Sequence, residues 1–203
     1  AAGALLFLPV VGTSRPVRIA AALAGVLLLA LAARPAVRVI HDARRQLDAL
    51  PMLASFEDDL EMERWAFQEA RGRRAAEHAT FGLFSLRLDL HAGRYPGAHI
   101  GAPPPDWTTY SALAVDVFVE GAEPLTLVLK VADADHDGSY EDRFHEYLAL
   151  EPGEHRVRIP LDRVAAGPRR RRLDLGRIDG VQLFVEGLER PRTVYVDGLR
   201  LVP

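Results

Sequence analysis

The sharpest chemical pattern in the chain is the acidic run Asp133-Ala134-Asp135-His136-Asp137-Gly138. Carboxylates at alternate positions followed by glycine match the start of a calcium-binding loop, because the turn at glycine lets oxygen ligands converge on one ion. Position 12 of such a loop normally holds a bidentate glutamate. Phe144 stands there instead. A calcium loop formed by Asp133, Asp135 and Asp137 therefore competes with a solvated acidic turn between two strands.

Other patterns that would support catalysis are missing from the sequence. The chain has no cysteine, which excludes disulfides, thiol chemistry and cysteine-type zinc sites. The acidic residues between Glu57 and Glu63 are neighbours in sequence, whereas a glycosidase needs two carboxyl groups facing each other across a cleft. No serine stands in a nucleophile elbow, and no glycine-rich phosphate loop occurs. We therefore expect a protein that is not an enzyme.

The charge distribution excludes another class of partner. The net charge is −3, and acidic and basic residues alternate along the chain. Nucleic-acid-binding domains carry a clustered basic patch, so we expect no nucleic-acid partner. The basic run 169–172 is short, and it is more typical of a solvated loop than of contact with anionic headgroups or acidic glycans.

Short strands are the elements that must position the acidic run. Residues 84–90 alternate between leucines on one face and polar side chains on the other, and the same period of two recurs in 113–120, 125–132, 156–159, 181–185 and 194–201. Glycine and proline turns separate these segments. Strands with one apolar and one mixed face indicate two packed antiparallel sheets. The sequence therefore predicts an all-β fold, an antiparallel β-sandwich, over residues 51–203.

The first 50 residues have a different character. Residues 1–15 are typical of the end of an upstream hydrophobic helix and a turn. Residues 16–33 are apolar except for Arg18, and as a helix they would span about 27 Å, near the hydrocarbon thickness of about 30 Å. We expect a transmembrane helix there, followed by an amphipathic juxtamembrane helix or stalk up to residue 50. A secretory signal and a buried soluble helix are the alternatives.

Several short motifs follow one another along the chain: Phe56-Glu57, Trp65, Gly82 to Leu88, Tyr95-Pro96-Gly97, Asp106-Trp107 to Tyr110, Asp142-Arg143-Phe144, Pro152-Gly153 and Val196 to Leu201. In this order they resemble the galactose-binding-like jelly rolls, which include family 11 carbohydrate-binding modules. The resemblance covers about residues 53–202, and the layout with its upstream helices is similar to the C-terminal end of VanZ-like membrane proteins.

The resemblance implies a jelly roll, a non-catalytic glycan-binding role and a location outside the cytoplasm. It also implies a structural calcium ion near the paired first and last strands, where Glu57 and Asp197 stand. The arginines flanking residues 16–33 are more numerous on the C-terminal side, which by the positive-inside rule would keep the module in the cytoplasm. We expect a cell-membrane protein with an extracytoplasmic module, and this conflict stays open.

Sugar rings stack their apolar faces on aromatic side chains and take hydrogen bonds from polar ones. Trp65, Trp107 and Tyr110 stand where the resemblance implies packing of the sandwich. The remaining candidates for a sugar site lie near loops or on a mixed strand face: Tyr95, Tyr140, Tyr147, Arg143, Asp133 and Asp135. The main alternative is a structural or protein-interaction β-sandwich without affinity for sugar.

Overall fold

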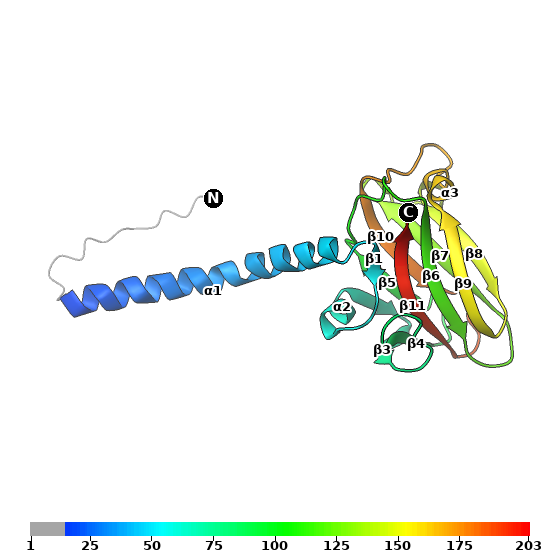
Figure 1. Ribbon diagram of the computed structural model, residues 1–203, viewed down its shortest axis with the longest axis horizontal. Coiled ribbons are helices and arrows are strands. Elements are labelled where there is room, and N and C mark those ends of the chain that lie inside the picture. Colours follow the sequence, from blue (N-terminus) through cyan, green and yellow to red (C-terminus); the bar gives the residue numbers. More distant parts are fainter. Residues whose placement is uncertain (1–14) are drawn as a thin grey trace. The chain divides into compact units, whose positions relative to one another are not determined.

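The computed structural model describes residues 15–203 of the chain. Its contacts divide the chain into one unit that ends at Arg45 and a second unit, Gln46–Pro203. The expected helix end and turn over residues 1–15 lie, apart from Arg15, outside the described residues. The first described element is the helix α1, Arg15–Asp48 (Figure 1).

Helix α1 exposes a run of large apolar side chains. Leu23, Val26, Leu27, Leu28 and Leu29 are between 59% and 72% exposed. Among the described residues, no helix is both long enough and apolar enough to cross a membrane. The helix itself was expected from the sequence, whereas the transmembrane span over residues 16–33 stays a prediction.

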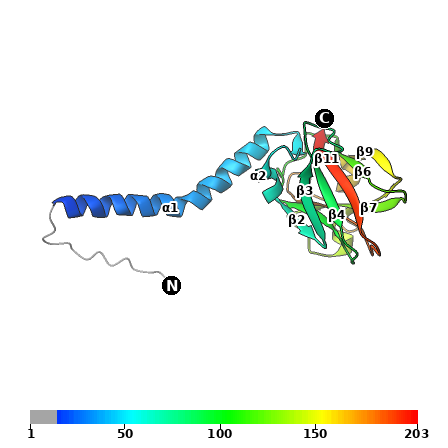
Figure 2. The same ribbon diagram turned by 90° about the horizontal axis from the view of Figure 1, so that it is seen from below.

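The second unit is a sandwich of two antiparallel sheets (Figures 1 and 2). The six-stranded sheet has the order β3-β4-β11-β6-β9, and β1 also pairs with β11. Its strands are β1 (Met52–Ala54), β3 (Ala70–Ala75), β4 (Ser85–Leu90), β6 (Ala112–Val119), β9 (Gly153–Pro160) and β11 (Arg192–Val202).

The five-stranded sheet has the order β2-β5-β10-β7-β8. Its strands are β2 (Trp65–Gln68), β5 (Gly97–Gly101), β7 (Leu125–Asp133), β8 (Phe144–Leu150) and β10 (Ile178–Phe184). Apart from the consecutive pairs β3–β4 and β7–β8, neighbouring strands in the two orders are not consecutive in sequence, and no βαβ unit occurs between the described strands. The predicted all-β, antiparallel two-sheet sandwich is therefore confirmed.

The core lies between the two sheets and follows from the alternation in the sequence. On β4, Leu86, Leu88 and Leu90 are at most 1% exposed, while Arg87 and Asp89 point away from the core. Burying each leucine contributes about 2 kcal/mol to stability. Trp107 is fully buried, and its indole nitrogen donates to the Pro104 carbonyl at 2.8 Å. Its predicted place in the core is thus confirmed.

Two short helices complete the second unit. Helix α3, Leu161–Ala165, buries Leu161, Val164 and Ala165. Helix α2, Asp59–Glu63, was not expected, because the acidic run from Glu57 to Glu63 suggested no element. The Asp58 side chain accepts a hydrogen bond from the Glu61 amide at 2.8 Å and caps this helix.

Candidate functional site

A row of polar side chains crosses the outer face of the five-stranded sheet. The Cα register pairs His99 with Gln182, Gln182 with Lys130, and Lys130 with His145. Ile100 and Glu146, which follow the two histidines, have their side chains on the core-facing side of the sheet. Because side chains alternate along a strand, the four paired residues share the face that points away from the core. We call His99, Gln182, Lys130 and His145 the polar row.

Two tyrosines border the polar row on its β8 side. Tyr147 lies two residues after His145 on β8 and therefore shares its face. Its hydroxyl is 3.1 Å from the hydroxyl of Tyr140 and donates to Glu186 at 3.2 Å. The Tyr140 ring lies 4.2 Å from the His145 ring, centroid to centroid. Both tyrosines are 46% exposed, so their rings are available to a ligand.

The tyrosine pair is held by contacts that fix its orientation. The hydrogen bond with Tyr140, together with burial and the charge of Glu186, raises the pKa of Tyr147. The guanidinium carbon of Arg143 lies 4.9 Å from the centroid of the Tyr140 ring. Cation–π contact of this kind orients both groups. The sequence predicted Tyr140, Tyr147 and Arg143 as ligand-binding residues, and the structure brings these three together.

Two buried nitrogen atoms, one in the polar row and one in the adjoining Arg143, have no hydrogen-bonding partner among the described residues. Nε of Arg143 and Nδ1 of His145 are buried and accept or donate no hydrogen bond within residues 15–203. Buried polar atoms are normally hydrogen-bonded, so each unpaired one needs an explanation. An external ligand that reaches this face would provide the missing partners.

Lys130 is the central cation of the polar row. It forms no hydrogen bond or ion pair with any described residue, although its side chain is only partly exposed. Burial, and secondarily the positive charge of Arg143, lowers the pKa of Lys130. Burial also lowers the pKa values of His99 and His145. The protein thus holds several basic groups on one face, and Lys130 among them has no carboxylate partner within the described residues.

Glycines let the polar row lie close to the sheet backbone. A Cβ atom at Gly180 would lie 2.8 Å from Nε2 of His99, and one at Gly101 would lie 3.3 Å from its Cε1. The imidazole therefore covers the two glycines. A side chain at Gly180 would displace His99 from the row, because real Cβ contacts are not that short.

A groove of about 420 Å³ adjoins the tyrosine pair. Its volume falls in the range of small-ligand sites, about 300–1,000 Å³. Tyr147 and Val128, which are register neighbours on β8 and β7, form part of its wall. We call this the end groove. Its other lining residues are Glu123, Pro124, Leu125, Thr126, Val185, Glu186, Gly187, Leu188, Glu189, Arg190 and Arg192.

Tyr95, the third tyrosine predicted for the site, lies before β5. It is 36% exposed, and its ring makes an edge contact with Phe184 at 6.0 Å between centroids. Phe184 ends β10 and is register neighbour of Val128, which lines the end groove. Arg94 also lies 5.2 Å from the centroid of the Tyr95 ring. Tyr95 thus lies in the loop before β5 of the same sheet, and β10 and β7 separate β5 from the tyrosine pair.

Asp133 and Asp135, the two carboxylates predicted to bind ligand, are bound to arginines. Asp133 is 1% exposed and accepts hydrogen bonds from Arg171 and from the Asp174 amide, both at 2.7 Å. Burial alone would raise the pKa of Asp133, but these donors outweigh it and lower the pKa. Asp135 pairs with Arg177 at 2.9 Å. We therefore leave both carboxylates out of the candidate sugar site.

The same arginine explains the geometry of the acidic loop. Arg171 bridges Asp133 and Asp142, and its hydrogen bond lowers the pKa of Asp142 to about 2. The guanidinium thus binds Asp133, one of the carboxylates predicted for a calcium ion, together with Asp142, which was not. Asp137 instead accepts from the Ser139 amide at 2.7 Å. Because Asp133, Asp135 and Asp137 each bind a different partner, they do not fit a calcium ion.

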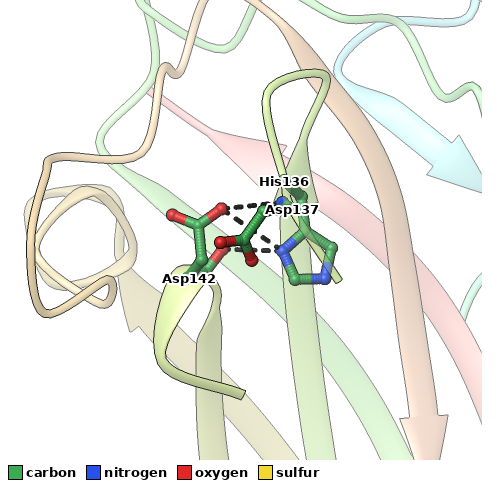
Figure 3. A group of neighbouring side chains, drawn as sticks. All are labelled: His136, Asp137 and Asp142. Atoms are coloured by element: carbon green, nitrogen blue, oxygen red, sulfur yellow. Dashed lines mark hydrogen bonds and ion pairs between the residues drawn. The ribbon is translucent and has the colours of Figure 1, made fainter. Parts of the chain in front are cut away.

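Two residues of the acidic run, His136 and Asp137, form a cluster with Asp142 (Figure 3). His136, Asp137 and Asp142 bring one potential ligand atom each within 4.8 Å of one another. The interactions within the group are already complete: His136 Nδ1 lies 2.8 Å from the Asp142 carbonyl, and the Asp137 amide donates to the Asp142 carboxylate at 2.9 Å. These contacts indicate a braced turn.

Glu57 and Asp197, the other predicted calcium ligands, hold the loop 80–84. The amides of Leu83 and Phe84 donate to Oε1 of Glu57, each at 2.9 Å. The amides of Thr80 and Phe81 donate to Oδ2 of Asp197 at 2.6 and 2.8 Å. Burial raises the pKa of Asp197, although these donors oppose the shift.

This loop geometry bears on the calcium prediction. Calcium takes oxygen ligands, whereas the groups that face Glu57 and Asp197 are amide donors. Gly82 makes the turn possible, since its φ of +72° is rarely adopted by other residues and a Cβ would meet the Glu57 carboxylate. A calcium ion at these carboxylates would have to replace the amides of loop 80–84.

Known proteins resemble this chain in fold but not in sequence. No family model matches the chain, and no curated protein sequence matches it. A solved family 11 carbohydrate-binding module from Clostridium thermocellum, in complex with a β-1,3-1,4-mixed-linked tetrasaccharide, superposes with a TM-score of 0.61 at 16% identity over 75% of this chain and 94% of that module. The fold is that of a carbohydrate-binding module.

Two further structures have the same fold. An exo-β-agarase superposes with a TM-score of 0.58 at 20% identity, over 75% of this chain but only 25% of the agarase. A xylan-binding domain of family 22 superposes with a TM-score of 0.50 at 15% identity, over 76% of this chain and 96% of that domain. The resemblance to family 11 modules is thus confirmed for the fold, while the VanZ-like context stays a prediction.

Sequence reasoning predicted none of the four residues of the polar row as site residues. His99, Gln182, Lys130 and His145 come from separate strands, and only the register brings them together. One signal was available, since Lys130 is the only lysine of the chain and interrupts an apolar strand. The arginine that neutralises Asp133 could not be identified either, because Arg171 lies 38 residues away.

Proposed function

We propose that the second unit is a non-catalytic carbohydrate-binding module, and that sugar binds on the outer face of its five-stranded sheet. The observation that carries this proposal is the exposed tyrosine pair, Tyr140 and Tyr147, between the polar row and the end groove. Tyrosine rings provide an apolar surface for the C–H faces of a pyranose. The unpaired groups of Arg143, Lys130 and His145 supply the hydrogen-bonding partners that hydroxyl groups need.

The fold comparisons support the same proposal. The module from Clostridium thermocellum is described in complex with a tetrasaccharide, and the family 22 domain is described as xylan-binding. At 16% and 15% identity these structures speak for the fold, so the argument for sugar rests on the tyrosines and the polar row of this chain.

Affinity electrophoresis of the 203-residue chain in gels that contain single soluble polysaccharides tests this function. We expect retardation by at least one polysaccharide, and Tyr147→Ala should weaken it about tenfold because about 1.4 kcal/mol of stacking is lost. Phe81→Ala is the matched control, since Phe81 is 51% exposed but lies in the loop held by Asp197. Lack of retardation across neutral and acidic polysaccharides would favour the structural or protein-interaction alternative.

We also propose that α1 tethers the module to a cell membrane, with the module outside the cytoplasm and a cell-surface or extracellular glycan as its ligand. The exposed leucines of α1 support the tether, because soluble proteins rarely leave contiguous apolar surface of this size in water. We propose as well that a structural calcium ion binds Glu57 and Asp197 by replacing the amides of loop 80–84.

A further inference from the structure

On the candidate sugar face, Lys130 and Arg143 are partly buried and have no ion pair with a described residue, whereas other arginines of the second unit without an ion pair, such as Arg73 and Arg170, are exposed. Arg163, Arg169, Arg171 and Arg177 are each paired with a carboxylate at the surface or in the acidic loop. Lys130 has no such pair within the described residues, and the same holds for Arg143. Lys130 lies on β7 and Arg143 directly precedes the adjacent strand β8, close enough for the charge of Arg143 to affect Lys130.

The carboxylates around this face form no ion pair with Lys130 or Arg143 within the described residues. Glu186 accepts a hydrogen bond from Tyr147 and keeps its negative charge near His145, while Glu146 pairs with Arg163 at 2.7 Å on the opposite side of β8. Asp179 is exposed and lies near His99, at the far end of the polar row. The centre of the row therefore keeps an excess of positive charge.

Burying a cation without a counter-charge is costly, and proteins normally pair such groups. Lys130 lies on β7, between Gln182 on β10 and His145 on the edge strand β8. The positive charge of Arg143, whose Nε has no partner among the described residues, acts on Lys130. An anionic group placed there would receive charge-assisted hydrogen bonds from two cations. Neutral hydroxyl groups would leave the excess charge uncompensated.

We propose that the ligand is an acidic carbohydrate, whose carboxylate or sulfate group is held by Lys130 and Arg143 while an adjacent ring stacks on the tyrosine pair. This inference rests on the proposed sugar-binding function and names its substrate class. Uronic acids and sulfated sugars share the anionic chemistry that the two cations recognise, and separate experimental arms distinguish them.

Calorimetry with matched oligosaccharides tests the inference. Oligogalacturonate is compared with its neutral methyl ester, and sulfated carrageenan oligosaccharides are compared with their desulfated forms, in buffer of about 0.15 M salt that screens loose attraction. We expect at least one acidic sugar to bind about tenfold more tightly than its neutral partner. The arm that shows the difference identifies carboxylate or sulfate.

Variants show which cation is responsible. Lys130→Met should abolish the preference for the acidic sugar while weak binding of the neutral partner remains, and Lys130→Arg should retain part of the preference because the charge is kept. Arg73→Met is the matched control, since Arg73 is exposed on β3 of the other sheet and has no ion pair with a described residue. A preference that persists in Lys130→Met would overturn the assignment.

The single lysine allows an independent measurement. Acetylation with an amine-reactive ester modifies only Lys130 and the terminal amine, so mass spectrometry of the peptide containing Lys130 reports on this site alone. The acidic sugar should protect Lys130 from modification. Equal or tighter binding of the neutral sugars would refute the acidic ligand and leave sugar binding intact, whereas no binding in any arm would refute both.

Discussion

At the scale of single residues, the structure separates two kinds of charged group that look alike in sequence. The acids of the run from Asp133 to Asp137 are bound by arginines or by backbone amides. Lys130 forms no ion pair with a described residue. The acidic pattern therefore indicates stability of a loop, and the unpaired lysine is the residue on which the proposal of an acidic ligand depends.

Arg171 is the residue whose loss should affect stability most. Arg171→Met leaves the buried Asp133 carboxylate without its counter-charge, so the free energy of unfolding should fall by about 3 kcal/mol at pH 7. Arg170→Met is the matched control, because the neighbouring Arg170 is exposed and has no ion pair with a described residue. Urea denaturation measures both. A change in Arg171→Met no larger than in Arg170→Met would contradict the role of this bridge.

The bridge formed by Arg171 also predicts how the stability of the protein depends on pH. The pKa values of Asp133 and Asp142 are lowered in the folded protein, to about 2 for Asp142. Their contribution to stability is therefore present above the ordinary carboxyl pKa, about 3.9, and is lost as the pH falls toward 2. Arg171→Met should flatten the loss of stability between about pH 5 and pH 2 relative to the unsubstituted protein.

At the scale of elements, alternation in the sequence was enough to predict strands and the sandwich. Leu86, Leu88 and Leu90 defined β4 and its buried face. The missed helix α2 shows the limit of that pattern, because its five residues contain too few apolar positions to show a period. Its cap was visible, since Asp58 stands three residues before Glu61.

The register of the five-stranded sheet was the information that the sequence lacked. Tyr140, Tyr147 and Arg143 are close in sequence, so their proximity was predictable. His99 and Gln182 join them only because β5 and β7 flank β10. Pairing between distant strands depends on the packing of the whole core, and no local pattern specifies it.

Loop 80–84 tests the calcium proposal at this scale. If calcium binds Glu57 and Asp197, the melting temperature should rise with calcium and fall with a chelator, because a ligand of the folded state stabilises it. Asp197→Asn should remove the calcium response, while Asp59→Asn, a change at an exposed carboxylate, should not. An unchanged melting temperature would mean that the four amide hydrogen bonds alone hold this loop.

At the scale of the whole chain, the helix and the module pose separate questions. A membrane tether predicts that the 203-residue chain floats with liposomes in a density gradient and resists extraction with alkaline carbonate. Replacing Leu27 and Leu29 with arginine should release it, since each charge costs about 2.5–3.5 kcal/mol at the centre of a spanning helix. A chain that does not float with the liposomes, or that carbonate extracts, would contradict the tether without affecting the sugar proposal.

The place of sugar binding is the central claim, and a nuclear magnetic resonance titration of the backbone amides measures it most directly. Addition of an oligosaccharide from a retarding polysaccharide should shift the amide signals of His99, Lys130 and Tyr147, on the outer face of the five-stranded sheet. Signals of Arg73 and Arg156, on the six-stranded sheet, should stay unchanged. Shifts confined to the six-stranded sheet, or no shifts at a saturating concentration, would contradict it.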